Sequence, residues 1–333
     1  MSNIIKIRFI ITKIQIFPKV NQIIILAVII LVTPVRGEEK SEIDETNGDN
    51  LRRLRLMTWN LENYRVTPSD FGQPKSLRSR NIIAEAIANH KPNILLLQEI
   101  GDENSIKNLQ NLIKKYHWAM PYSASLISSE KTNVLNTALL STCVIEKIPD
   151  NGLNHYLHMG QLLPIQRGIL FCTAKTQHFG ALAIICLHLK SHREVVFGDQ
   201  EIMREKEAIL VRKKLNSFMR QAPNALIVVG GDLNDHPNSK TLKVLKGTLA
   251  SRLYDVRPTE KTSFSRNSNN GIAWTHYYQQ EDSYSRFDYF LINRQLKNLI
   301  DYGNTFIVER EAWDLASDHR PLLMTIKIQQ TPE

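Results

Sequence analysis

The chain has 333 residues, of which 42% are hydrophobic and 23% charged, and its formal net charge is +9. This balance argues against an intrinsically disordered protein, because such chains carry few hydrophobic residues. The length allows one large domain or two smaller ones, with enough chain to bury a substantial core.

The first 37 residues differ from the rest of the chain. Lys6, Arg8, Lys13 and Lys19 precede an uncharged apolar run over residues 23–32, and small residues follow that run. This order is typical of a secretory signal peptide, and a run of this length is short for a membrane span, which needs about 20 residues. We therefore predict a signal peptide over residues 1–37, or an uncleaved anchor in its place. The predicted protein is secreted or periplasmic.

The charge and the cysteines of the remaining chain constrain its function only weakly. The leader contains five basic residues, including Arg36, and no acidic residue, so the remaining chain has a net charge of 9 − 5 = +4. This charge is compatible with a polyanionic substrate. Cys172 and Cys186 are compatible either with a disulfide across neighbouring strands or, with Cys143, with small buried apolar residues.

Residues 38–50 are polar and acidic and predict a linker, which leads into one domain over residues 51–330. Strands are predicted at 54–60, 93–99, 138–145, 168–174, 181–187, 225–229, 286–292 and 321–328, from alternation or short apolar runs. Helices are predicted at 78–89, 105–115, 200–220 and 239–245. Because strands outnumber helices and cluster in the centre, we expect two packed sheets flanked by helices.

Short polar motifs lie in or at the ends of these predicted strands, where loops on a rigid sheet commonly build sites. They contain Asn60, Glu99, His188, Asp232 with Asn234, Asp288, and Asp318 with His319. Each has a structural alternative: a turn for Asn60, a solvated carboxylate for Glu99, a buried structural imidazole for His188. Together, carboxylate and amide oxygens suit Mg²⁺, and the histidines and an aspartate suit proton transfer to or from a phosphoryl group.

In this order, Trp59-Asn60-Leu61, Gln98-Glu99, His188-Leu189-Lys190-Ser191, Gly231-Asp232-Leu233-Asn234, Phe287-Asp288-Tyr289 and Ser317-Asp318-His319-Arg320-Pro321 resemble the motifs of the endonuclease/exonuclease/phosphatase family. The resemblance extends from about residue 54 to residue 325. It implies an α/β (α+β) fold of the four-layered sandwich type, with two packed, mostly antiparallel or mixed sheets flanked by helices.

The resemblance also implies a role for each residue. Asn60 and Glu99 would bind Mg²⁺, or Mn²⁺ in its place, with Asp318 as a ligand or a neighbour of a ligand. Asp232 would activate the attacking water, and Asn234 would help hold it. His188 and His319 would contact the scissile phosphate, with Asp288 fixing the tautomer of His319. Arg167 and Lys190 would contact substrate phosphate.

The implied reaction is direct attack of activated water on phosphorus, without a covalent enzyme intermediate. DNA is the favoured substrate, because Lys190, His192 and Arg193 place cationic groups beside His188. A sphingomyelinase-type phospholipase C, a phosphoinositide phosphatase and an inactive binding protein of the same fold remain as alternatives. The aromatic segment Trp274–Tyr278 is the candidate membrane contact in the lipid alternative. We expect a monomer without a stable protein partner, and a membrane contact only if the substrate is a lipid.

Overall fold

The computed structural model describes residues 52–68, 72–127, 135–149, 152, 154–176, 180–196, 198–261, 271–309 and 313–328. The predicted leader and linker lie outside these residues. Within the described part of the chain, no helix combines the length and the apolar character needed to span a bilayer.

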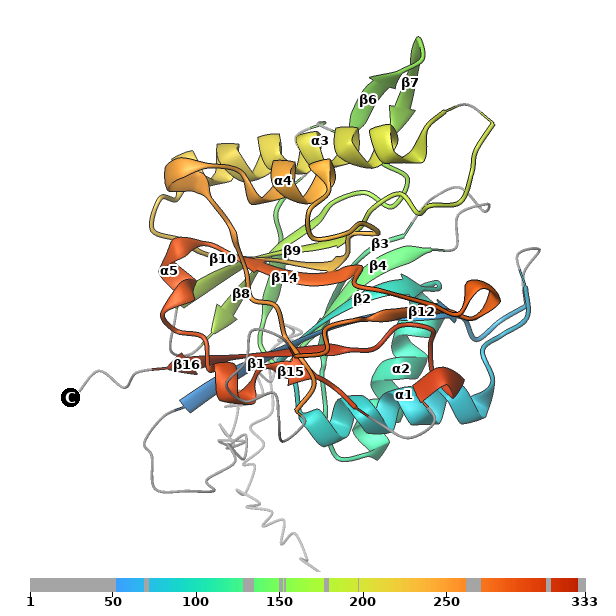
Figure 1. The fold of residues 1–333 in the computed structure, drawn as a ribbon. Coiled ribbons are helices and arrows are strands. Elements are labelled where there is room, and N and C mark those ends of the chain that lie inside the picture. Colours follow the sequence, from blue (N-terminus) through green and yellow to red (C-terminus); the bar gives the residue numbers. More distant parts are fainter. Residues whose placement is uncertain are drawn as a thin grey trace, which may run out of the picture. The chain divides into compact units, whose positions relative to one another are not determined.

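Most strands belong to two six-stranded sheets, which Figure 1 shows between two pairs of helices. The first sheet has the order β15-β16-β1-β2-β4-β3 and is formed by Phe306–Ile307, Leu322–Ile328, Arg52–Tyr64, Ile94–Ile100, Asn136–Ser141 and Tyr122–Leu126. The second has the order β11-β14-β10-β9-β8-β5 and is formed by Tyr254–Asp255, Asp288–Ile292, Leu226–Asp232, Gly180–His188, Leu170–Thr176 and Ile145–Lys147.

Both sheets are mixed. The pairs β1–β2 and β9–β10 are parallel, and the other ladders are antiparallel. Two separate hairpins complete the strands, β6 (His155–His158) with β7 (Gln161–Pro164) and β12 (His276–Tyr278) with β13 (Ser283–Ser285).

The helices cover the outer faces of the two sheets. Helices α1 (Leu77–His90) and α2 (Glu103–Lys115) pack on the first sheet, and α3 (Gln200–Gln221) and α4 (Lys240–Lys246) pack on the second. A short helix α5 (Arg294–Lys297) follows β14, and 3₁₀ turns occupy Leu249–Ser251, Gln279–Glu281, Tyr302–Asn304 and Trp313–Leu315. The predicted four-layered α/β sandwich is confirmed.

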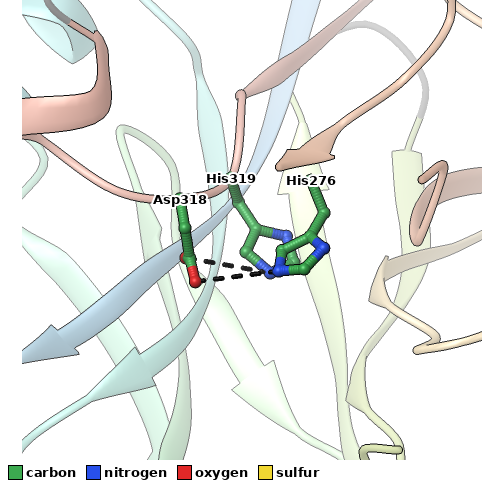
Figure 2. Close-up of side chains that lie close together, drawn as sticks. All are labelled: His276, Asp318 and His319. Carbon is green, nitrogen blue, oxygen red and sulfur yellow. Dashed lines mark ion pairs between the residues drawn. The ribbon is translucent and has the colours of Figure 1, made fainter. Parts of the chain in front are cut away.

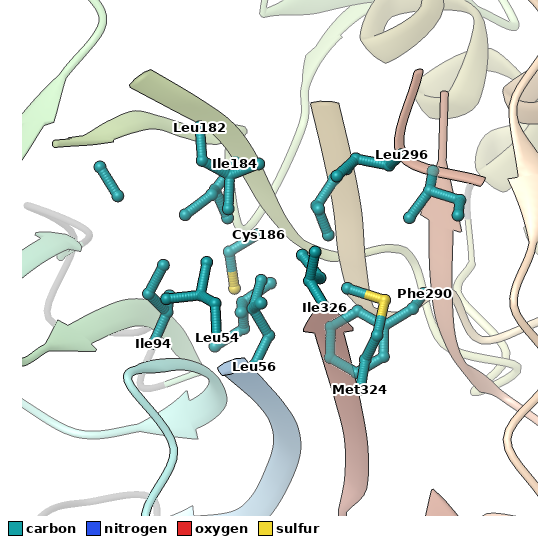
Figure 3. Close-up of a cluster of buried hydrophobic side chains, with 14 of the residues drawn as sticks. Leu54, Leu56, Ile94, Leu182, Ile184, Cys186, Phe290, Leu296, Met324 and Ile326 are labelled. Carbon is teal, nitrogen blue, oxygen red and sulfur yellow. The ribbon is translucent and has the colours of Figure 1, made fainter. Parts of the chain in front are cut away.

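A continuous apolar core joins the inner faces of the two sheets (Figure 3). Leu56 and Leu96 from the first sheet meet Ile184, Cys186 and Phe290 from the second, and all five are fully buried. Because two sheet faces pack at a fixed spacing of about 10 Å, this core also fixes the distance between the strand ends of the two sheets.

The predicted strand over residues 138–145 is wrong as a single element. The chain leaves β4 in the first sheet after Ser141 and enters the second sheet at Ile145 as β5. The break has a local cause, because the Ser141 hydroxyl accepts the backbone N–H of Cys143 at 3.0 Å and turns the chain away from the ladder. The three cysteines are free thiols, so the disulfide alternative is absent from the structure.

Candidate active site

The polar strand ends predicted from the sequence meet at one edge of the sandwich. In the second sheet, Asp232 pairs with His188 on β9 and with Asp288 on β14, so these three residues form one row across the sheet. In the first sheet, Asn60 pairs with Gln98, next to Glu99. The two groups touch, because Asn60 Nδ2 donates to Asp232 Oδ2 at 3.0 Å.

Asp232 lies at the centre of this cluster and is buried. Its Oδ2 atom lies 3.6 Å from His188 Nε2 and 3.8 Å from His319 Nε2. Its other oxygen accepts the backbone N–H of Asn234 at 2.9 Å. A buried carboxylate flanked by two imidazoles and held by two donors is positioned to exchange a proton with a group bound between the rings.

His319 is held in one orientation by three contacts. Its Nδ1 lies 2.8 Å from Asp288 Oδ2, and its backbone N–H donates to Ser317 Oγ at 3.0 Å. Its carbonyl accepts from Trp59 Nε1 at 2.9 Å. The Asp288 contact places the Nδ1 proton between the two groups, so Nε2 is the nitrogen that faces the cluster.

The titratable groups of the cluster have strongly perturbed pKa values. Burial raises the pKa of Asp232 to about 6 against the opposing charge of His319. Burial, with Arg167 and His319, holds the pKa of His188 well below its usual value. For His319 burial acts in the same direction, but Asp288 and Asp232 outweigh it and hold its pKa well above the usual value. At neutral pH the site therefore combines a neutral and a charged imidazole around an ionised carboxylate.

Two residues of the predicted set have left-handed backbone conformations, which side chains other than glycine rarely adopt. Glu99 has φ 57° at a bulge in β2, and Asn234 has φ 50°. The bulge turns the Glu99 carboxylate toward the site, where Oε2 accepts from the backbone N–H of Asn63 at 3.0 Å and Oε1 lies 3.3 Å from Asn60 Nδ2. Such strain is concentrated at functional sites because the surrounding structure must hold it.

Carboxylates also converge at the rim of the site. Glu62, which the sequence analysis missed, forms an ion pair with Lys75 at 3.2 Å. Burial raises the pKa of Glu62 against the effect of Lys75, and the charges of Asp318 and Glu99 raise it further. Mutual repulsion among Glu62, Glu99 and Asp318 is what a divalent cation would relieve, and their oxygens suit Mg²⁺. Binding by Asn60 would require its amide to turn, because Nδ2 now faces the carboxylates.

One of the two predicted phosphate-binding residues, Arg167, shares a backbone carbonyl partner with Asn234. Arg167 Nη1 and Asn234 Nδ2 each donate to the Leu189 carbonyl at 3.0 Å. The Lys190 ammonium donates to the carbonyls of Ser191 and Arg193 within its own loop. Its backbone N–H donates to the buried Glu207 on α3 at 2.8 Å, which holds the loop against the helix.

His276 is the second residue of the cluster that the sequence analysis did not single out. Its Nε2 lies 3.7 Å from Asp318 Oδ2, and its ring centroid lies 4.6 Å from that of His319 (Figure 2). Two rings of the predicted aromatic segment pack against Tyr284 on β13, Trp274 with a centroid distance of 4.9 Å and Tyr277 with one of 4.7 Å. No local pattern identifies His276, since only the pairing of β12 with the distant segment at Asp318 brings it into the site.

Comparisons with known proteins agree with the geometry. A model of the endonuclease/exonuclease/phosphatase family matches residues 57–319. Truncated TDP2 from Caenorhabditis elegans is 18% identical with a TM-score of 0.57, covering 82% of this chain and 97% of that chain. The human Nocturnin catalytic domain with bound sulfate anion is 17% identical with a TM-score of 0.55, covering 83% and 95%.

A third solved structure, beta toxin 275-280 from Staphylococcus aureus, is 15% identical with a TM-score of 0.56, covering 81% of this chain and 99% of that chain. At these identities the solved structures support the fold alone. No curated protein sequence matches the chain. The family model spans most of the domain and contains each of the polar strand ends described above. The chain therefore belongs to the endonuclease/exonuclease/phosphatase family.

Proposed function

We propose that this protein is a secreted or periplasmic Mg²⁺-dependent endonuclease that hydrolyses phosphodiester bonds in DNA. The observation that carries the proposal is the position of Asp232, a buried carboxylate with His188 Nε2 at 3.6 Å and His319 Nε2 at 3.8 Å. Direct hydrolysis of a phosphodiester needs a proton acceptor for water beside groups that neutralise charge on the phosphoryl oxygens.

In the proposed reaction, Asp232 accepts a proton from the attacking water while Asn234 helps position that water. Charged His319 donates from Nε2 to a phosphoryl oxygen, and Asp288 keeps the Nδ1 proton in place. Neutral His188 donates a second hydrogen bond to the phosphoryl group. Glu99, Asn60 and Asp318 would hold Mg²⁺, or Mn²⁺ in its place, which when bound stabilises negative charge on the leaving oxygen.

Charge favours a polyanionic substrate. Residues 38–333 have a net charge of 9 − 5 = +4, and His192 and Arg193 are exposed on the loop that follows His188. Arg167 is held next to the cluster by its hydrogen bond to the Leu189 carbonyl. The Lys190 ammonium is hydrogen-bonded to carbonyls of its own loop. Arg193 is therefore the basic residue of this loop that would contact the DNA backbone.

A lipid phosphodiester is the second candidate, favoured by the β6–β7 hairpin. Leu157, Met159 and Leu162 on this hairpin are 64%, 76% and 68% exposed. Exposed apolar side chains on a protruding hairpin suit contact with a bilayer. Within the described residues, this hairpin supports the alternative more strongly than the segment Trp274–Tyr278, in which Tyr278 is 39% exposed.

The deciding experiment incubates the purified protein with supercoiled plasmid and, in parallel, with sphingomyelin vesicles, each with Mg²⁺ or with EDTA. We expect nicking that requires Mg²⁺, and a loss of about 10²–10⁴-fold in Asp232→Asn, the usual effect of removing a general base. Glu146→Gln, in the exposed ion pair with Lys175, is the matched control and should leave nicking unchanged. If the plasmid stays intact and phosphocholine is released, the substrate of this site is a lipid and not DNA.

The proposed export and monomeric state are tested separately. Mass spectrometry of the protein recovered from the periplasm or the medium should show a new N-terminus close to residue 38. Size-exclusion chromatography with light scattering should give the mass of a single chain. A dimer, or a full-length protein that remains with the membrane fraction, would contradict these two expectations.

A further inference from the structure

His276 is fixed beside Asp318 and His319 by backbone pairing. A bridge joins His276 to His319, and the backbone N–H of Tyr277 donates to the Asp318 carbonyl at 3.0 Å. The N–H of Arg320 donates to the Thr275 carbonyl at 2.7 Å on the other side. These bonds hold the three side chains in register without any contribution from the side chains themselves.

The three side chains point toward a common centre, as Figure 2 shows. Asp318 Oδ2 lies 3.7 Å from His276 Nε2, and Asp318 Oδ1 lies 4.0 Å from His319 Nε2. One ligand atom from each residue lies within 4.8 Å of the other two. Neighbouring ligands of a tetrahedral ion with bonds of about 2.0–2.1 Å are about 3.3 Å apart, so side-chain rotations of modest size would close this site around an ion.

The ligand chemistry differs from that of the carboxylate rim. Two imidazole nitrogens and one carboxylate suit Zn²⁺ and its neighbours, whereas Mg²⁺ prefers oxygen ligands alone. His319 also has the outer contact that metal-bound histidines use, because Asp288 Oδ2 holds its Nδ1 at 2.8 Å and leaves Nε2 for the ion. The oxygen-rich group and this trio share Asp318, whereas the two imidazoles belong to the trio.

We propose that His276, Asp318 and His319 form a second metal site that binds a transition ion of the Zn²⁺ type. The structural role of His276 is compatible with this site. Its ring stacks on Phe287 at 5.2 Å, which uses the face of the ring and leaves Nε2 at its edge directed to Asp318. The site is therefore preorganised by packing as well as by the backbone.

Occupation of this site would inhibit the proposed hydrolysis, and this consequence rests on the proposed function. A metal-bound His319 Nε2 has no proton to donate to the phosphoryl oxygen. Asp318 would at the same time be drawn away from Glu99 and Asn60, with which it would hold Mg²⁺. Zn²⁺ would thus act as an inhibitor of an enzyme that Mg²⁺ activates.

Metal binding is measured first, on the full-length protein stripped of metal. Isothermal titration with Zn²⁺ should show one site in the wild type. Its affinity should fall by about tenfold or more in His276→Gln, because even loss of a residue that only hydrogen-bonds to a metal ligand lowers metal affinity by about 10–100-fold. His155→Gln, at an exposed histidine on β6, is the matched control and should bind as the wild type does. Asp318→Asn provides a second variant if His276→Gln unfolds, and it should lose affinity to a similar extent.

Co²⁺ gives an independent readout, because imidazole-bound Co²⁺ in a site of low coordination number absorbs strongly in the visible range. The wild type should show this absorption, and His276→Gln should lose it. Equal Zn²⁺ affinity in the wild type, His276→Gln and Asp318→Asn would overturn the proposal.

Inhibition is measured second, with Zn²⁺ added to the Mg²⁺-dependent reaction. The concentration of Zn²⁺ that halves turnover should rise in His276→Gln by the same factor as the dissociation constant. Unchanged inhibition in this variant would refute the inhibitory role. If no phosphodiester is hydrolysed at all, the proposed function fails, while the titration still decides whether the second metal site exists.

Discussion

The two histidines of the site, His188 and His319, differ in charge because their surroundings shift their pKa values in opposite directions. Burial lowers the pKa of both His188 and His319, and together with the charges of Arg167 and His319 it makes His188 neutral. His319 remains charged because Asp288 and Asp232 lie close to its two nitrogens. Asp232 Oδ2 therefore lies close to one neutral and one charged imidazole, an asymmetry that suits a site with a proton acceptor beside a developing charge.

Asp288→Asn tests the source of the His319 charge. The substitution keeps the size of the side chain but removes its negative charge and offers Nδ1 an amide donor, which favours the wrong tautomer. We expect turnover to fall on the order of 10³-fold or more, with unchanged circular dichroism. A variant within tenfold of the wild type would show that Asp288 does not control the tautomer of His319.

The pH dependence of turnover tests Asp232. The carboxyl group must be ionised to accept a proton, and its pKa is raised to about 6. At saturating metal, kcat/KM should therefore increase with pH, with a midpoint near pH 6. A limb near pH 4, where an unperturbed aspartate titrates, would assign the acidic transition to another group.

The close approach of strands β9 and β10 brings His188 and Asp232 to the same edge of the second sheet. Strand β10 ends in Gly230-Gly231-Asp232, and Gly231 has φ 133°. A Cβ atom at Gly231 would lie 2.0 Å from the Leu187 carbonyl oxygen on β9. Only glycine allows this approach, which sets Asp232 beside His188.

Gly231→Ala should therefore damage both stability and the site. Gly180→Ala is a matched control, because Gly180 also has a positive φ of 70° but no atom within 4 Å of the new Cβ. The control should lose about 1–2 kcal/mol from backbone strain. Gly231→Ala should lose clearly more in urea unfolding, or retain stability by moving β10 and lose turnover. Equal behaviour of the two variants would contradict a steric role for Gly231.

The whole molecule depends on the core between the sheets, which also determines the chemistry of its thiols. Cys172 and Cys186 are buried in this core, and burial raises the pKa of each to about 12. Cys143 is only partly buried at the turn between β4 and β5. The thiolate is the reactive form of cysteine, so the two core thiols should be inert while the sheets remain packed.

Alkylation of the native protein should accordingly modify Cys143 alone, and all three cysteines should react after unfolding in urea. Intact-mass spectrometry without reductant counts the added groups. If the unfolded protein accepts only one group until it is reduced, two of the three cysteines form a disulfide and the free thiols of the structure are contradicted.

Local sequence patterns predicted much of the fold. The predicted helix 78–89 is observed as Leu77–His90, and the predicted strand 181–187 as Gly180–His188. Both are long segments with a clear pattern of apolar residues. The hairpins β6–β7 and β12–β13 were missed, because their strands have only three or four residues and no continuous apolar face. Residues 138–145 were joined in error, since the turn at Ser141 rests on one side-chain hydrogen bond.

The sequence by itself determined the order of polar strand ends, the apolar elements that carry them and the family resemblance, because each of these is a property of neighbouring residues. Tertiary structure alone decided which of those groups meet. His276 enters the site through pairing with a strand segment more than 40 residues away, and Lys190 turns from the site toward its own loop. The charges of His188 and His319 also depend on the fold, since burial and distant carboxylates act through space rather than along the chain.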